Sequence, residues 1–243
     1  MSNSILVTND DESDFLPIIH LNENEDGKDI DSIPKIIPIL PLRNTVLFPG
    51  IVIPITVGRD KSLQAVNEAY KSDKFIGVIT QKDANKDDLT ASDLYAVGTI
   101  AKIIKRIKMP DGGTTIIFQG KYKFKIIDLI NDELYLKANI ELIHNEEINE
   151  KTDEFKALLD SIKDLSNQIV KNSPNIPTEA SIVLKNIENP HFLMNFVSSN
   201  LNANIEEKQK LLEFIHPFNR AEYLIGLLHK ELNFAELKNK VHT

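Results

Sequence analysis

Apolar and polar residues alternate along several short stretches between residues 34 and 144, with the period of two that is typical of half-buried β-strands. The segment from Lys121 to Ile126 shows this pattern clearly, because lysines separate Tyr122, Phe124 and Ile126. A strand here places these three apolar side chains on one face and three lysines on the other. The predicted strands are Ile51 to Val57, Phe75 to Thr80, Val97 to Lys108, Thr114 to Phe118, Lys121 to Ile126 and Leu134 to Ile143.

The same region contains one predicted helix and one predicted hairpin turn. Apolar residues with helical spacing predict a helix from Asp60 to Ser72, with Asp60 or Ser62 as its N-cap. The sequence Asp111-Gly112-Gly113 predicts a tight turn, because glycine tolerates the positive φ that hairpin turns require. Several strands at this spacing, with one helix, favour a small barrel or folded sheet.

The stretch from Pro38 to Pro54 is apolar, yet it carries four prolines and a single charge, Arg43. Each proline lacks an N–H and fixes φ, so no long helix passes through this stretch. A central β-strand is not expected to hold several prolines either. We therefore expect short extended segments, edges and turns that still bury the apolar side chains.

This proline-rich stretch holds more apolar residues than one face of a short strand buries. Either all of them belong to the core, or a few line an exposed groove, since exposed apolar patches usually mark binding sites. The candidates for contact with a bound substrate are Leu42, Arg43, Val46, Phe48, Pro49 and Ile51.

The periodicity changes from two to 3.6 near residue 145, and the rest of the chain is predicted to be helical. A first helix carries an apolar stripe from Phe155 to Val170, and a second runs from Thr178 to Asn186. Asn189-Pro190 is typical of the N-cap and first residue of a third. A fourth helix is predicted from Ile205 to Ile215, where Pro217 ends it, and a last one from Asn219 to Val241. The stripe of the last helix runs almost to Val241, so we expect this helix to continue past the end of the sequence.

These patterns predict an α+β protein with three parts. Residues 1–33 are predicted to be an acidic, flexible leader, residues 34–144 a β-rich small barrel or folded sheet, and residues 145–243 a helical bundle that ends in a long helix. The leader holds nine acidic residues and one lysine, which accounts for the whole net charge of −8. It is predicted to be solvated; the alternative is that it docks through residues Phe15 to Leu21.

The composition is that of a soluble globular protein, with 42% hydrophobic and 26% charged residues. No apolar run reaches the roughly 18 residues of a membrane span, and the N-terminus lacks the basic start of a secretory signal. The chain contains no cysteine, so disulfides and thiolate metal sites are excluded. We expect a cytoplasmic protein that does not bind membranes.

No motif for catalysis is found. Gly120-Lys121 does not belong to a phosphate-binding P-loop. The motif would require glycine at position 115 and Ser or Thr at position 122, and the sequence has Thr115 and Tyr122 there. No histidine pair has the spacing of a helical zinc site, and Ser161 and Lys163 are two residues apart on a predicted helix, where side chains do not meet. Paired acids such as Asp87-Asp88 are interpreted as solvated. We expect no cofactor, no metal and no enzymatic activity in this chain.

Basic residues gather on the predicted hairpin, namely Lys102, Lys105, Arg106, Lys108, Lys121, Lys123 and Lys125. Strand alternation could collect several of them on one face that binds nucleic acid. We favour a solvated, edge-protecting role, since lysines on a strand discourage edge-to-edge aggregation. The balance of charge outside the leader also argues against a nucleic-acid partner.

Three blocks of sequence carry a family resemblance. The first is Pro41-Leu42-Arg43-Asn44-Thr45-Val46-Leu47-Phe48-Pro49-Gly50, followed by Pro54 and Val57-Gly58-Arg59. The second is Gln81-Lys82-Asp83 with Asp93-Leu94-Tyr95-Ala96-Val97-Gly98-Thr99-Ile100-Ala101, and the third is Glu206-Glu207-Lys208-Gln209-Lys210-Leu211-Leu212-Glu213. In wording and order these blocks resemble the N-terminal domain of Lon, the ATP-dependent serine protease. The resemblance covers residue 34 to the C-terminus and excludes the acidic leader.

The resemblance implies a β domain, a helical bundle and a long helix that leads into an AAA+ module. It implies recognition of unfolded or damaged proteins in protein quality control, and support of homohexamer assembly. The ATPase, with its ATP and magnesium, and the Ser–Lys peptidase would lie downstream of this chain. The alternative is a stand-alone Lon-type domain that binds a small ligand or RNA.

Overall fold

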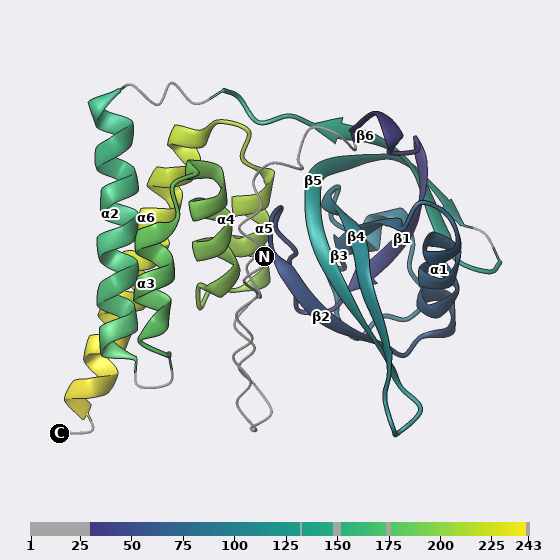
Figure 1. Cartoon of the computed structure of the whole chain (residues 1–243), viewed down its shortest axis with the longest axis horizontal. Helices are drawn as coiled ribbons and strands as arrows, with labels where there is room; N and C mark the ends of the chain where they lie inside the picture. Colours follow the sequence, from purple (N-terminus) through teal and green to yellow (C-terminus); the bar gives the residue numbers. More distant parts are fainter. Residues whose placement is uncertain (1–29, 132, 148–151, 174–175, 242–243) are drawn as a thin grey trace, which may run out of the picture. The chain divides into compact units, whose positions relative to one another are not determined.

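The computed structural model describes residues 30–131, 133–147, 152–173 and 176–241 (Figure 1). Most of the predicted leader, residues 1–29, therefore lies outside the described residues. Residues 30–33 were predicted to belong to the leader, but the structure joins them to the first unit. Ile30–Ser32 form a 3-10 helix, η2, and Ile33 packs against the core. The chain divides between Ile143 and His144 into two compact units, one residue from the change in periodicity.

Among the described residues, the strands and one α-helix belong to the first unit. Its elements are β1 (Ile36–Leu42), β2 (Val52–Val57), α1 (Asp60–Lys71), β3 (Phe75–Thr80), η3 (Ala91–Asp93), β4 (Val97–Lys108), β5 (Thr114–Asn131) and β6 (Leu136–Ile143). The six strands form one sheet in the order β2-β5-β4-β3-β1-β6, and β5 also pairs with β6. This extra pairing closes five strands into a ring and leaves β2 outside it, paired only with β5. The predicted α+β class is thus confirmed.

Strand β5 is longer than predicted, since the two strands expected on either side of Gly120 are one element of 18 residues. Its first half pairs with β2 and β4, and its second half pairs with β6. The register with β4 shifts between Ile100 and Ala101, opposite Lys121. A bulge of this kind lets a strand bend without ending, so Gly120 marks a bend where the sequence suggested a break.

Strand β1 corrects the prediction for the proline-rich stretch, because it contains Pro38 and Pro41 and still has a neighbour on each side. It pairs with β6 over Ile36–Pro38 and with β3, in parallel, over Ile39–Leu42. Each proline therefore lies in a half of the strand that is paired on only one side, where the missing N–H costs no ladder hydrogen bond. The prediction of an edge holds for β2, which contains Pro54.

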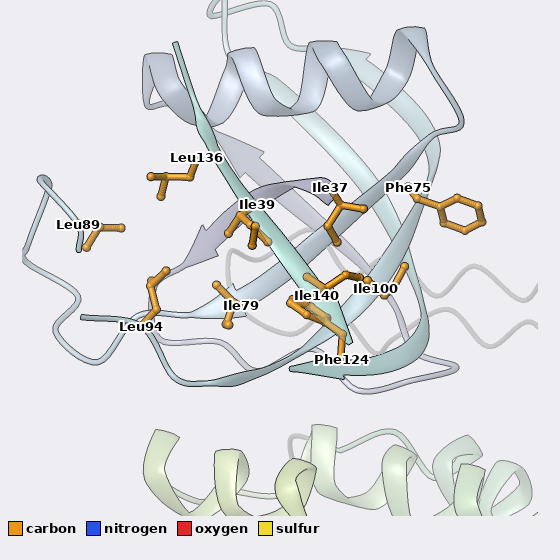
Figure 2. Close-up of a cluster of buried hydrophobic side chains, with 11 residues drawn as sticks. Ile37, Ile39, Phe75, Ile79, Leu89, Leu94, Ile100, Phe124, Leu136 and Ile140 are labelled. Carbon is orange, nitrogen blue, oxygen red and sulfur yellow. The ribbon is translucent and has the colours of Figure 1, made fainter. Parts of the chain in front are cut away.

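The core of the ring forms around Phe124, which is fully buried (Figure 2). Two glycines make room for its ring: a Cβ at Gly77 would lie 3.0 Å from Phe124 Cζ, and a Cβ at Gly98 would lie 2.8 Å from Phe124 Cε1 and 2.4 Å from Val78 O. Tyr122 and Ile126 pack on the same cluster, so the predicted apolar face of this strand is confirmed. The opposite face departs from the prediction at Lys123, which is 4% exposed.

The segment between β1 and β2 is fixed to the outside of the sheet by hydrogen bonds to its backbone. Thr80 Oγ1 donates to Thr45 O (2.7 Å), and Thr99 Oγ1 donates to Leu47 O (2.6 Å). Gly50 N donates to Gly120 O (2.9 Å), and a Cβ at Gly120 would lie 2.3 Å from Phe48 O. Only a glycine at position 120 allows this segment to approach so closely.

Helix α1 packs against β1, β3 and β6. Neither predicted N-cap residue caps it: the helix begins after Arg59, whose side chain makes no capping hydrogen bond. Asp60 and Ser62 are instead residues of its first turn. The predicted hairpin turn is present between β4 and β5, where Gly112 has φ 90° and Met109 N donates to Gly113 O (2.8 Å).

The second unit consists of helices. They are α2 (Asp153–Asn172), α3 (Glu179–Asn186), α4 (Pro190–Asn200), α5 (Ile205–Glu213) and α6 (Pro217–Val241). Asn189 caps α4 as predicted, since its side chain accepts from Phe192 N (2.9 Å). Pro217 was expected to end a helix but begins α6, which is reasonable because the first turn of a helix tolerates a missing N–H. No helix of the described residues is both long and apolar enough to cross a membrane.

We expect Phe124→Ala to destabilise the first unit by about 3–5 kcal/mol, because it leaves a cavity over Gly77 and Gly98. Urea unfolding, with hydrogen exchange of the strand amides, measures this loss. Ile127→Ala, on the same strand but 49% exposed, is the control and is expected to cost less than about 0.5 kcal/mol. Unchanged protection of the β5 amides in Phe124→Ala would contradict the placement of this ring.

We expect Gly120→Ala to destabilise the protein by about 1–3 kcal/mol, since its methyl group collides with backbone and not with a flexible side chain. The segment from Thr45 to Ile51 has to move, so the Gly50 amide should exchange faster with solvent. Gly58→Ala is the matched control, because no atom lies within 4 Å of a Cβ built there. Equal stabilities of the two variants would refute this packing.

Candidate functional site

A groove of about 580 Å³ opens on the first unit beside the end of β1. It is bounded by β1, the first turn of α1, the loop that follows β3, and the start of β6. The residues that line it are Ile39, Pro41, Gly58, Arg59, Asp60, Lys61, Ser62, Asp87, Asp88, Leu89, Thr90 and Leu136.

The floor of the groove is apolar because it is one end of the barrel core. Ile39, Leu89 and Leu136 line the groove and are also members of the buried cluster around Phe124 (Figure 2). Each of these three side chains is less than 10% exposed, so they border the groove while they remain buried in the core. Apolar floors with a few polar groups at the rim are typical of ligand-binding sites.

Arg59 holds the wall of the groove through both of its terminal nitrogens. Its Nη1 donates to Gln81 Oε1 (3.0 Å), and its Nη2 donates to Pro41 O (2.9 Å). Burial lowers the pKa of the Arg59 guanidinium; the charge of Arg43 lowers it further, and that of Asp87 opposes this. An arginine remains protonated despite such shifts, so Arg59 keeps a fixed positive charge at the rim.

Gln81 anchors the loop that forms the opposite wall. It is 2% exposed; its Nε2 donates to Asp83 O (2.6 Å) and Lys86 O (3.1 Å), and its backbone N donates to Leu42 O (2.9 Å). These bonds fasten the loop to the end of β1, where the groove lies. The loop is therefore held in a fixed position as one wall of the groove.

Asp93 closes the same loop at its far end. A hydrogen bond from Lys86 (2.8 Å), together with bonds from the backbone and side chain of Thr90, lowers the pKa of the Asp93 carboxyl to about 2. A carboxyl with a depressed pKa stabilises the fold at neutral pH, and this contribution is lost as the pH falls from about 4 towards 2. Asp93 is therefore ionised at neutral pH and accepts these hydrogen bonds as a carboxylate.

An ion pair between Arg43 and Asp87 joins the end of β1 to this loop across the groove rim. Both side chains are largely exposed, 41% and 77%, so the pair contributes little to stability. It neutralises Asp87 and places the Arg43 guanidinium beside the groove.

The six residues predicted to contact a substrate fall into two groups. Leu42, Val46, Phe48 and Ile51 are at most 5% exposed and pack in the interior of the first unit. Pro49 is half-buried, and Arg43 is exposed at the groove rim. The structure therefore does not bring the six together on one surface, and their role in binding stays a prediction.

The sequence reasoning missed the residues that build the groove. Asp87 is solvated as predicted, with 77% of its side chain exposed, but its ion pair with Arg43 was not foreseen. Arg59 and Gln81 were noticed only as parts of two motifs, Val57-Gly58-Arg59 and Gln81-Lys82-Asp83, which face each other through the Arg59–Gln81 hydrogen bond. The only signal in the sequence was that each of the two residues lies in a block that resembles a known family.

The structure assigns other roles to the groups considered for catalysis. Ser161 Oγ donates to Ala157 O (2.8 Å), and Lys163 Nζ donates to Ile187 O (2.8 Å), so the two side chains do not form a dyad. Glu146 pairs with His216 (2.6 Å) and Glu207 with Lys230 (2.8 Å), both near the surface. Among the described residues, no group of three or more acidic or histidine side chains is placed to hold a metal ion.

Comparison with known proteins identifies the family of the chain. Residues 36–230 match the family model of the ATP-dependent protease La (LON) substrate-binding domain. The chain is 44% identical over 234 residues to a Lon protease of Flavobacterium johnsoniae and 43% identical over 230 residues to one of Cytophaga hutchinsonii. These alignments cover 96% and 95% of the chain, but the chain spans only 28% of the length of either relative.

Two solved structures share the fold. The N-terminal domain of a Mycobacterium avium complex Lon protease aligns with a TM-score of 0.67 and 22% identity, over 80% of this chain and 98% of that one. A Lon N-terminal domain protein from Xanthomonas campestris aligns with a TM-score of 0.58 and 18% identity, over 79% and 97%. The resemblance found in the three sequence blocks is thereby confirmed, and the chain belongs to the family of Lon substrate-binding domains.

Proposed function

We propose that this chain is the part of a Lon-type ATP-dependent protease that recognises and holds unfolded or damaged proteins. The match of residues 36–230 to a Lon substrate-binding domain is the observation that carries this proposal. The groove supplies a physical basis, because it combines an apolar floor with a rim that is fixed by Arg59 and Gln81.

An unfolded polypeptide differs from a folded one mainly in its exposed apolar side chains. Ile39, Leu89 and Leu136 offer such side chains a surface that is already held in place by the core. A preformed site avoids the entropy cost of ordering loops on binding. The buried residues of the proline-rich stretch would then act indirectly, by fixing the end of β1, while Arg43 and Pro49 remain available at the surface.

The rest of the proposal concerns the longer protein. The ATPase that uses ATP and magnesium, and the Ser–Lys peptidase, would be in the part of its relatives that this chain does not span. The chain would support assembly of a homohexamer in the cytoplasm, with unfolded proteins and other copies of itself as its partners.

RNA binding is less well supported than polypeptide binding. Lys105 and Lys108 are three residues apart on β4, opposite Ile117 and Thr114, so their side chains point to opposite faces of the sheet. Lys123 is buried. These three lysines therefore do not belong to one exposed stripe of the kind that phosphate binding requires.

We expect this chain alone neither to hydrolyse ATP nor to cleave casein. The sequence has no P-loop, and Ser161 and Lys163 each bond to a backbone carbonyl. Phosphate release and peptide release are the measurements. Turnover that a single Ser or Lys substitution in the chain abolishes would contradict this expectation.

We expect the chain to bind a labelled, permanently unfolded protein weakly, in the micromolar range or above. A single copy lacks the avidity of an assembly, which multiplies affinity by ~100-fold or more. Binding should survive a rise in salt from about 50 to 500 mM, because apolar contacts are not screened, whereas any RNA binding should vanish. Fluorescence anisotropy at both salt concentrations measures this.

Gly58→Trp tests whether the groove is the binding site. Position 58 lines the groove and has open space around it, so an indole there should fill the groove and abolish binding. Gly226→Trp is the matched control, because Gly226 is exposed, has equally open surroundings and lies on α6 in the second unit. Tight RNA binding with a steep salt dependence, and no polypeptide binding, would refute the proposed function.

A further inference from the structure

The sequence that precedes the described residues contains an apolar segment of seven residues with acids on both sides. It reads Phe15-Leu16-Pro17-Ile18-Ile19-His20-Leu21 and includes no acid, lysine or arginine. Asp14 comes directly before this segment, and Glu23 follows it after one asparagine. Apolar segments of this kind are what an unfolded polypeptide presents. The chain therefore carries, in its own sequence, the chemistry that the groove is proposed to recognise.

The point at which this segment joins the structure is within reach of the groove. Ile33 N donates to Ile30 O (3.3 Å), and Ile33 packs against the buried cluster that supplies the groove floor. Ile33 and Pro41, at the groove, are at most roughly 28 Å apart even if the chain between them is fully extended. Residues 22–29 join Leu21 to Ile30 and span up to roughly 30 Å. The segment can thus reach the groove of its own chain.

Such a tether makes even a weak contact effective. A short flexible linker gives the segment an effective concentration of roughly 1 mM at the groove. With an intrinsic Kd of about 100 μM, the segment would fill about 90% of the grooves. A competing polypeptide would then bind about 10-fold more weakly than to an empty groove. Affinity in this weak range needs only a few apolar contacts.

The charges at the groove rim neither attract nor repel the acids that flank the segment. Three basic and three acidic side chains balance one another there, namely Arg43, Arg59, Lys61, Asp60, Asp87 and Asp88. Selection of an occupant therefore falls to the apolar floor of Ile39, Leu89 and Leu136. An apolar segment whose acids lie outside the part that enters the groove fits this arrangement.

The segment also lies within the range aligned with a known relative. The alignment with the Lon protease of Flavobacterium johnsoniae covers 96% of the 243 residues and so omits only about ten of them. It therefore includes residues 15–21, although the match to the substrate-binding family model begins at residue 36. The segment thus precedes the matched domain and is still part of the comparison with this relative.

We propose that residues 15–21 occupy the groove of their own chain and compete there with polypeptide substrates. The occupied groove is the self-inhibited form, and a substrate has to displace the segment in order to bind. This inference rests on the proposed function, because it names what regulates that same site. The expectation of a solvated leader would then hold for its acids and not for this apolar segment.

The test uses the full chain with substitutions in the leader. The segment variant removes three apolar side chains of the segment through Phe15→Ser, Ile18→Ser and Ile19→Ser. The matched control variant makes the same kind of change in the other apolar part of the leader, through Ile5→Ser, Leu6→Ser and Val7→Ser. Both variants keep the length and the charge of the leader.

A disulfide reports directly whether the segment is in the groove, because the chain has no cysteine of its own. His20→Cys places a thiol at the one position of the segment that is neither apolar nor proline. Gly58→Cys places the second on the groove wall, where no atom lies within 4 Å of a Cβ. Under mild oxidation, the bond within one chain should form about 10-fold faster in the wild-type and control backgrounds than in the segment variant.

Binding of a labelled, permanently unfolded protein reports the competition. Fluorescence anisotropy should show the segment variant binding about 10-fold more tightly than the wild type, while the control variant binds like the wild type. Adding Gly58→Trp to the segment variant should abolish this binding, which assigns the gain to the groove. A peptide of residues 10–25, added to the segment variant, should displace the unfolded protein.

The outcomes separate the two proposals. Equal disulfide rates in the three backgrounds, or a bond that joins two chains and slows on dilution, would overturn the inference. It is also overturned if the segment variant binds the unfolded protein no better than the control; in either case, binding that Gly58→Trp abolishes leaves the proposed function standing. If no variant binds the unfolded protein, the proposed function fails, and self-inhibition fails with it even where the disulfide forms.

Discussion

The packing of one aromatic ring on two glycines sets the geometry of the first unit. Phe124 on β5 lies over Gly77 of β3 and opposite Gly98 of β4; a Cβ at Gly98 would collide with its ring, and a Cβ at Gly77 would crowd it. The contact therefore fixes how closely β5 packs against β3 and β4. Ile39 and Leu136 belong to the same buried cluster. They form the floor of the groove, so the shape of the site depends on a contact inside the core.

The same balance of burial explains why most apolar side chains of the proline-rich stretch lie in the core. Leu42, Val46, Phe48 and Ile51 together bury four large side chains, and each contributes roughly 1.5–3 kcal/mol when fully buried. Exposing them to a substrate would sacrifice that stabilisation whenever no substrate is bound. A groove whose floor is already part of the core avoids this loss, because its walls need not open.

The sequence predicted the elements whose pattern is local and missed those decided by tertiary contacts. A short apolar run located β3 and alternation located β4 at their observed bounds, and the Asn189-Pro190 pair identified the start of α4, because each signal lies within a few residues. The course of β1 was not predictable in this way, since its prolines are tolerated only because its pairing changes sides between Pro38 and Ile39.

The groove was hidden from the sequence for the same reason. Arg59 and Gln81 are 22 residues apart and their contact depends on the closure of the ring, while Asp87 is indistinguishable from a solvated acid until Arg43 is placed beside it. The sequence motifs that contain Arg59 and Gln81 were recognised only through their resemblance to a known family. They did not indicate that the two side chains bond to each other. Periodicity reports which face of an element is buried; it does not report which polar residues meet at the end of a core.

Under the proposed function, the groove would suit a site that releases what it binds. Two charged groups at its rim already have partners: Arg59 bonds to Gln81 and Pro41, and Asp87 pairs with Arg43. A substrate that competed for them would gain little, because it would exchange one hydrogen bond for another. Net affinity would then come mainly from the apolar floor. Such a site would bind many sequences weakly, and several copies of it could hold a polypeptide through avidity while each contact remains short-lived.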